Sequence, residues 1–160
     1  MDLLKNFLKK KENIFFLFII VIIIFLDKIS KLKIINNLNN RIHYVNEYIN
    51  LDLTWNIGIG FGLLSTTSQF IYNLITLIIG VVIFIIFYMS INLEKIEKFA
   101  FSFIIGGALG NLHDRIIYKA VPDFIDIHYH NFHWFTFNLA DIFITIGIII
   151  YILKGLIVKE

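Results

Sequence analysis

Two aspartates, Asp123 and Asp141, stand where a carboxylate is unusual. Asp123 lies in the stretch VPDF, and Asp141 lies near the start of the apolar run FNLADIFITIGIII. Two carboxyl groups in one poorly hydrated site cannot both ionise cheaply, so one of them keeps its proton. A proton donor beside a proton acceptor is the pair needed to activate water against a peptide bond. The alternative is a loop residue at Asp123 and a helix start around Asp141.

The residues next to both aspartates favour fixed directions for the two side chains. Pro122 has a fixed φ and pushes the residue before it towards an extended backbone. Asn138 stands three positions before Asp141, so the two side chains share one face of a helix. We therefore expect Asn138 either to cap this helix or to orient the carboxyl pair.

The composition places the chain in the membrane class. Of its 160 residues 58% are hydrophobic, with one proline, and the mean hydropathy is +0.80. Soluble domains are about 45–50% apolar. The formal net charge of +2 is too small to indicate nucleic-acid binding. Without any cysteine, disulfides, thiolate metal sites and a cysteine nucleophile are excluded.

Four apolar segments predict the fold. Each is about as long as the 20 or so helical residues that cross a bilayer. We expect one integral-membrane domain over residues 1–160, a mainly α, four-transmembrane-helix bundle with a small β-sheet and loop on the outer membrane surface. The basic start of the chain lacks a small-residue cleavage site, so we interpret it as an uncleaved first span. The spans cover roughly residues 14–35, 70–91, 99–117 and 137–153.

The lysines indicate the orientation of this bundle. They cluster in the leader, in the segment NLEKIEK and in the tail, so both chain ends should be cytoplasmic. The first and third spans then end, and the fourth begins, at the outer face. Charged groups at such depths are costly and usually functional. The residues that should gather there are Asp27, Lys31, Asn111, Asp114, Arg115, Asn138 and Asp141.

The two outer segments carry strand patterns. Apolar and polar residues alternate in INLDLTWN, which is typical of a half-buried strand. The glycines of NIGIGFG then favour a tight loop around Asn56. The second outer segment, residues 118–136, contains VPDFIDIHYHNFHWF and predicts short strands or loop.

Two polar groups on the spans have simpler interpretations as well. Asp27 and Lys31 share a helix face and can pair, although a lysine that snorkels to the interface is the favoured interpretation of this pair alone. Gly106 and Gly110 form a small-xxx-small pattern that lets another helix approach closely, and Asp114 continues the same stripe.

Other chemistries have little support. The sequence contains neither G-x-S-x-G nor H-E-x-x-H. His128, His130 and His133 with Asp126 offer metal-binding side chains, but their spacing matches no zinc pattern, and an exposed aromatic loop is the favoured interpretation. We expect neither a metal nor a cofactor.

Five blocks, DKISK, NIGIGFG, GGALGNLHDR, VPDF and FNLAD, together resemble the lipoprotein signal peptidase (signal peptidase II) family in order and spacing. The resemblance covers most of the chain. It implies a bacterial inner-membrane aspartic endopeptidase that removes signal peptides from diacylglyceryl-modified prolipoproteins, just before the lipidated cysteine. It also implies membrane lipids as neighbours, no nucleic-acid partner and a monomer.

Carried over block by block, the resemblance implies that Asp123 and Asp141 are catalytic. The supporting or substrate-binding residues would be Asn56, Gly58, Asn111, Asp114, Arg115, Asn138, Asp27 and Lys31. The chain departs from the family pattern at Pro122, Ala120 and Gly60, which concern backbone detail rather than a proposed catalytic group.

Two other functions remain open at this point. Intramembrane aspartates also serve proton relays, so a small proton-coupled membrane carrier is the alternative. A carrier places its site near the midplane with access from both sides, whereas the polar residues here are expected at the outer face. A structural membrane adaptor would leave the two aspartates without a task.

Overall fold

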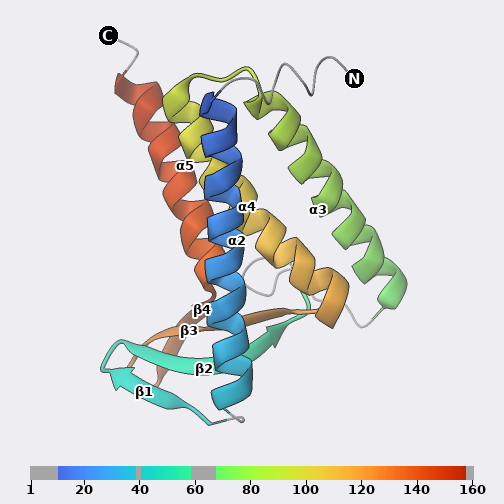
Figure 1. Cartoon of the computed structure of the whole chain (residues 1–160). Coiled ribbons are helices and arrows are strands. Elements are labelled where there is room, and N and C mark those ends of the chain that lie inside the picture. Colours follow the sequence, from blue (N-terminus) through green and yellow to red (C-terminus); the bar gives the residue numbers. More distant parts are fainter. Residues whose placement is uncertain (1–10, 39–40, 59–67, 158–160) are drawn as a thin grey trace.

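The computed structural model describes residues 11–38, 41–58 and 68–157. These ranges contain four helices and four short strands (Figure 1). The helices are α2 (Lys11–Asn37), α3 (Gln69–Ser90), α4 (Lys95–Tyr118) and α5 (Leu139–Ile157), and the strands are β1 (His43–Asn46), β2 (Ile49–Asn56), β3 (Val121–Tyr129) and β4 (Phe132–Phe137).

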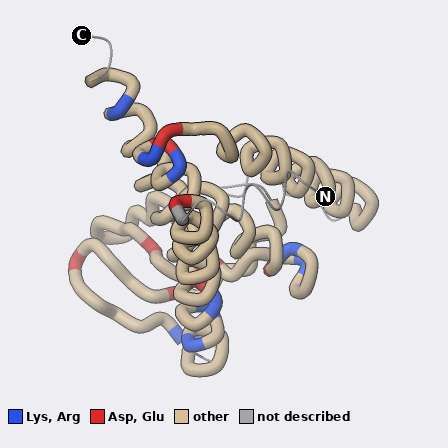
Figure 2. Tube along the Cα trace, turned by 45° about the horizontal axis from the view of Figure 1, so that its top comes forward, with Lys and Arg blue, Asp and Glu red and all other residues tan. Residues whose placement is uncertain are grey.

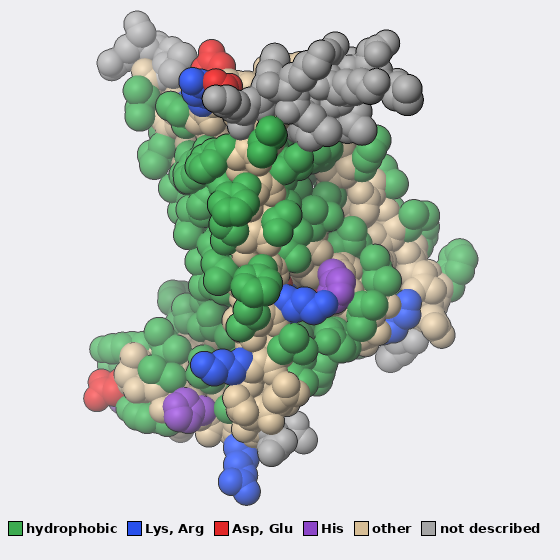
Figure 3. Space-filling view, viewed as in Figure 1, with side chains coloured by type: hydrophobic (Ala, Val, Ile, Leu, Met, Phe, Trp, Pro, Cys, Tyr) green, Lys and Arg blue, Asp and Glu red, His purple; other side chains and the backbone are tan. Residues whose placement is uncertain are grey.

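The helices form a bundle whose outer surface is apolar. Figure 3 shows hydrophobic side chains covering the bundle between its two ends. Large side chains such as Phe18, Phe70 and Phe84 are 60–77% exposed, which an aqueous surface would not favour. The helix α3 carries no charged residue along its length (Figure 2). This surface is suited to lipid.

Three helices, α2, α3 and α5, are long and apolar enough to cross a membrane. The helix α4 is of similar length but carries charged residues at both ends, and it is not among the three. The described residues thus establish a membrane-type helical bundle with three candidate spans. The α2 start and the α5 end lie at one end of the bundle, and the sheet lies at the other (Figure 1).

The sheet is antiparallel and has the strand order β1-β2-β3-β4. The strand β2 coincides with the predicted strand INLDLTWN, and β3 and β4 occupy the second predicted outer segment. In the β2–β3 register Thr54 pairs with Asp123 and Asn56 pairs with Val121. An irregularity between Leu51 and Thr54 shifts this register. The end of β2 is therefore brought beside Asp123.

The helix α4 packs against α2, α3 and α5, and small residues permit its closest approaches. A Cβ on Gly106 would meet Ile23 at 2.9 Å, and a Cβ on Gly110 would meet Asp27 Oδ2 at 2.6 Å. The predicted glycine stripe is therefore confirmed as a packing surface for α2. A small apolar core, Phe16, Ile20, Ile83 and Ile105, lies between the helices.

The helix boundaries differ from the sequence prediction at one functional position. The fourth apolar segment was expected to begin at Phe137, but Phe137 is the last residue of β4 and α5 begins at Leu139. Asn138 thus lies between a strand and a helix. The departure at Gly60 and the basic leader up to residue 10 lie outside the described residues.

Candidate active site

Asp123 has a buried carboxyl group that accepts hydrogen bonds from two side-chain amides. It lies on β3 and is 4% exposed. Its Oδ2 accepts a hydrogen bond of 2.9 Å from Asn56 Nδ2, and its Oδ1 accepts one of 2.6 Å from Asn138 Nδ2. Burial, followed by the neighbouring Asp141 charge, raises the pKa of Asp123 to about 6, and the bond from Asn56 opposes this rise. Asp123 can therefore exist in either protonation state near neutral pH.

Asp141 is half-buried and lies in the first turn of α5. Its Oδ1 accepts a hydrogen bond of 2.8 Å from Asn111 Nδ2, and its Oδ2 accepts one of 3.1 Å from the backbone N–H of Asn138. The backbone N–H of Asp141 donates in return to Asn138 Oδ1 at 3.1 Å. This exchange is a capping box, with Asn138 at the N-cap and Asp141 at the third helical position.

Asn138 is the residue that joins the two carboxyls. Its backbone N–H and side-chain oxygen hold Asp141, and its side-chain nitrogen holds Asp123. The residue is fully buried, which fixes its amide in one orientation. The two expected roles, helix cap and orienting group, are therefore both present in one side chain.

Lys31 lies at the centre of a second polar cluster. Its Nζ donates to Asp27 Oδ2 at 2.7 Å, to Asp114 Oδ2 at 2.6 Å and to Asn111 Oδ1 at 2.8 Å. The side chain is 2% exposed, so the expectation of a snorkelling lysine is wrong. The reason is α4, which brings Asn111 and Asp114 against the α2 face that carries Lys31. All three donors of the ammonium are thereby satisfied.

The Lys31 cluster connects to the carboxyl pair through an amide. Because the oxygen of Asn111 accepts from Lys31, its nitrogen faces Asp141. Asp27 makes a separate contact, since its Oδ1 accepts a hydrogen bond of 2.9 Å from the backbone N–H of Ala140. Asp27 thus caps the start of α5 from another helix, which supplements the cap by Asn138.

Ala140 was missed by the sequence analysis. It is fully buried, and the Ala140 carbonyl oxygen lies against Gly107 of α4. A larger residue at either position would separate the two helices and draw Asp141 away from Asn111. The signal in the sequence was the pair of small residues, Gly107 and Ala140, on two segments that both carry polar groups.

Asn56, Gly58 and Arg115 form the third part of the site. Asn56 Oδ1 accepts from the backbone N–H of Gly58 at 2.9 Å, which leaves its Nδ2 directed to Asp123. Arg115 Nη2 donates to the Gly58 carbonyl oxygen at 2.7 Å. The end of β2 is therefore tied to α4 through Gly58 and to β3 through Asn56.

Ala120 and Pro122, where the chain departs from the family pattern, both suit the backbone conformation at their positions. The left-handed residue after α4 is Lys119, with φ 57°, so Ala120 does not occupy a conformation that requires glycine. Pro122 is buried opposite Trp55 of β2. Neither residue displaces Asp123.

The histidines of the second outer segment lie outside this site. His133 Nδ1 is 2.7 Å from Asp126 Oδ2, and His128 Nδ1 is 3.9 Å from the same oxygen. His130 has a left-handed φ of 52° between β3 and β4. In residues 11–38, 41–58 and 68–157 no group of three His, Asp or Glu side chains has the arrangement of a metal site.

The arrangement supplies a buried carboxyl and a half-buried carboxyl, each with amide donors, at the end of a lipid-facing bundle beside a sheet. Polar groups buried in such a bundle are typical of a membrane enzyme. A solved structure of a bacterial membrane enzyme, determined by the in meso method at 2.3 Å resolution, has a TM-score of 0.75 and 29% identity to this chain, covering 91% of it and 89% of the other.

Sequence comparisons give the family. Residues 19–157 match the family model for signal peptidase (SPase) II. A lipoprotein signal peptidase of Pelagibacter ubique is 44% identical over 149 residues, covering 91% of this chain and 90% of the relative. One from Rickettsia akari is 41% identical over 138 residues, covering 84% and 70%. The chain belongs to the signal peptidase II family.

Family membership confirms the resemblance drawn from the five sequence blocks. It also decides against a carrier and an adaptor, because the matched family consists of peptidases.

Proposed function

We propose that this protein is an aspartic endopeptidase that removes the signal peptide from diacylglyceryl-modified prolipoproteins, cutting just before the lipidated cysteine. Removal of a signal peptide is the activity of the matched family, and the similar relatives are lipoprotein signal peptidases. The observation that supports the aspartic mechanism is the junction at Asn138, which holds Asp123 and Asp141 at one place.

The reaction needs one proton on the carboxyl pair. The ionised carboxylate takes a proton from water, whose oxygen attacks the carbonyl carbon of the scissile bond. The protonated carboxyl donates a hydrogen bond to the carbonyl oxygen and then its proton. When the tetrahedral intermediate collapses, one of its hydroxyls returns a proton to the pair, the C–N bond breaks and the leaving nitrogen receives a proton from the pair. Buried Asp123 and half-buried Asp141 match a site that water reaches from one side.

The remaining polar residues support the pair. Asn56, Asn111 and Asn138 orient the carboxyls, while Arg115 fixes the backbone at Gly58, beside which the substrate backbone lies. Lys31, with Asp27 and Asp114, keeps the Asn111 amide turned towards Asp141. Such preorganised donors stabilise charge where it develops in the transition state.

The bundle is oriented with four spans in the bacterial inner membrane. The helix α4 serves as the fourth span, since its charged residues lie near its ends and its centre is apolar. Both chain ends face the cytoplasm, and the carboxyl pair lies near the outer face. The lipid tails of the substrate lie between helices, and its signal helix packs beside them. The protein acts as a monomer.

The test is cleavage of a lipidated precursor in vitro, with the unlipidated precursor alongside. Asp123→Asn and Asp141→Asn each remove an ionisable group at nearly constant shape, and we expect cleavage to fall by about a thousandfold or more. Glu47→Gln, an exposed carboxyl in the turn between β1 and β2, is the matched control and should cleave normally. Thermal unfolding checks that all three variants are folded. Near-normal cleavage by either Asp→Asn variant would refute the aspartic mechanism.

A further inference from the structure

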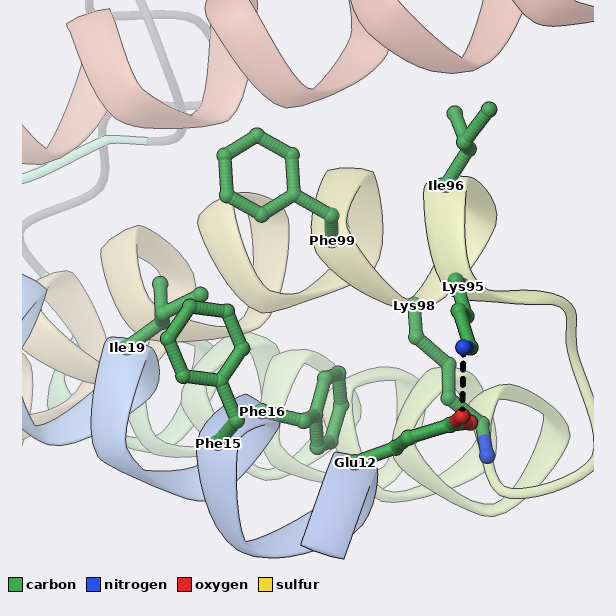
Figure 4. Close-up of a pocket in the computed structure, with 8 residues that line it drawn as sticks. All are labelled: Glu12, Phe15, Phe16, Ile19, Lys95, Ile96, Lys98 and Phe99. Carbon is green, nitrogen blue, oxygen red and sulfur yellow. Dashed lines mark ion pairs between the residues drawn. The ribbon is translucent and has the colours of Figure 1, made fainter.

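A pocket lies at the opposite end of the bundle from the carboxyl pair, where α2 and α4 begin. Its volume is about 480 Å³, within the range of ligand pockets in proteins. Figure 4 shows its lining side chains, which come from these two helices alone. They are Phe15, Phe16, Ile19, Ile96 and Phe99, together with Glu12, Lys95 and Lys98.

Lys98 is the unusual member of this lining. It is 7% exposed, and its Nζ donates a hydrogen bond of 2.8 Å to Asn13 Oδ1, on a residue that is itself 1% exposed. An ammonium group has three hydrogen-bond donors. Among the described residues, Asn13 provides the one acceptor for Lys98 Nζ. A buried charge is costly unless it is well paired. Lys98 is therefore suited to receive an anionic group that enters the pocket.

Lys95 stands at the mouth of the pocket. It pairs with Glu12 at 2.9 Å, with the two side chains 78% and 50% exposed (Figure 4). Exposed pairs of this kind contribute little, so Lys95 can exchange its partner at small cost. The lining carries two lysines against one glutamate. The sequence adds Lys9, Lys10 and Lys11 directly before Glu12, so this end of the chain is basic.

The rest of the lining is apolar and opens onto the lipid-facing surface. Phe15 is 60% exposed and Phe99 is 40% exposed, from α2 and α4 respectively. An elongated hydrocarbon can lie between these helices while a charged group stays at their ends. A water-soluble anion would not fill the aromatic part of the pocket. A soluble peptide could not reach this part, because it opens towards the bilayer.

We propose that this pocket binds a phospholipid with an anionic headgroup. The phosphate accepts hydrogen bonds from Lys98 and Lys95, and one acyl chain lies against Phe15, Ile19 and Phe99. The bound lipid joins the start of α2 to the start of α4 at the end remote from the carboxyl pair. This binding site does not depend on the peptidase mechanism.

The experiment is native mass spectrometry of the detergent-purified, delipidated full chain, titrated with phosphatidylglycerol or phosphatidylcholine. One lysine near a phospholipid headgroup contributes about a fivefold change in affinity. We therefore expect Lys98→Gln and Lys95→Gln each to weaken phosphatidylglycerol binding about fivefold. Ile19→Trp, which fills the apolar part, should weaken binding of that lipid without altering charge. Lys33→Gln, an exposed lysine at the other end of α2, is the control.

The outcomes distinguish a specific site from general lipid adsorption. Equal affinity for the two lipids, or equal loss in the Lys33→Gln control, would overturn the proposal. Competition by soluble glycerol phosphate at the same concentration as the lipid would show a phosphate site without an acyl-chain groove, which also overturns it. If Lys98→Gln does not fold, Lys95→Gln and Ile19→Trp still decide the result.

Discussion

The side-chain amide of Asn138 donates a 2.6 Å hydrogen bond to Asp123 Oδ1 while the same residue caps the helix that carries Asp141. A strand residue and a helix residue are thus held together by the one residue between β4 and α5. Any movement of α5 relative to β3 changes the Asp123 contact and the helix cap together. The geometry of the carboxyl pair is therefore coupled to how α5 begins.

This coupling predicts different effects for two substitutions. Asn138→Ser keeps an oxygen that can cap α5 but has no amide to donate to Asp123, so stability should stay close to that of the parent while kcat falls about tenfold to a hundredfold. Asn138→Ala loses both contacts and should also lose about 1 kcal/mol of stability. Cleavage kinetics and thermal unfolding measure the two effects. Equal kcat for Asn138→Ser and the parent would show that the amide has no orienting role.

The pH dependence of cleavage provides a second prediction. Burial foremost raises the pKa of Asp123 to about 6. The reaction needs one proton on the pair, so kcat/KM should fall as the pH rises through about 6, where the free enzyme loses that proton.

The hydrogen bond from Asn56 stabilises the ionised form of Asp123 and so lowers its pKa. In Asn56→Ala the pKa of Asp123 should rise, and the falling limb of the normalised kcat/KM profile should move to higher pH. Asn73→Ala, at an exposed position of α3, is the control and should leave the limb in place. A limb that stays fixed in Asn56→Ala, or moves to lower pH, would contradict the proposed role of Asp123.

The sequence predicts what depends on local pattern. The strand β2, the glycine stripe of α4 and the helix cap by Asn138 all follow from periodicity and spacing, and the structure confirms them. Lys31 was interpreted wrongly because the pattern of α2 alone shows one partner, whereas its other two partners lie on α4.

The cross-strand contacts were beyond sequence reasoning for a physical reason. The approach of Asn56 to Asp123 depends on the register between β2 and β3, and that register is shifted by an irregularity between Leu51 and Thr54. A shift of one residue turns every later side chain to the other face of the sheet. The contact from Asp27 to the backbone of Ala140 likewise depends on how closely two helices approach.

The Lys31 cluster predicts a large effect from a single neutralising change. Lys31→Met removes the one cation shared by Asp27 and Asp114, both of which remain buried. Removing one partner of a buried ion pair typically costs about 3–5 kcal/mol. We expect a marked decrease in the unfolding temperature and in cleavage, since Asn111 is no longer held towards Asp141. Lys33→Met, at an exposed position two residues after Lys31 in α2, is the control and should behave as the parent in both measurements.

The contact between Gly110 and Asp27 predicts that a single methyl group on α4 disturbs the site. In Gly110→Ala the new Cβ would lie 2.6 Å from Asp27 Oδ2, so Asp27 must move away from Lys31 or from Ala140. Overpacking of this kind costs about 1–3 kcal/mol. We expect a lower unfolding temperature in detergent and slower cleavage.

Gly155→Ala is the matched control in α5, because a Cβ there meets nothing within 4 Å. Replacing a helical glycine by alanine in open space gains up to about 1 kcal/mol, so the same chemical change should stabilise at position 155 and destabilise at position 110. Cleavage by Gly155→Ala should match that of the parent. Effects of the same sign at both positions would mean that helix propensity, rather than the approach of α2 to α4 at Asp27, governs the result.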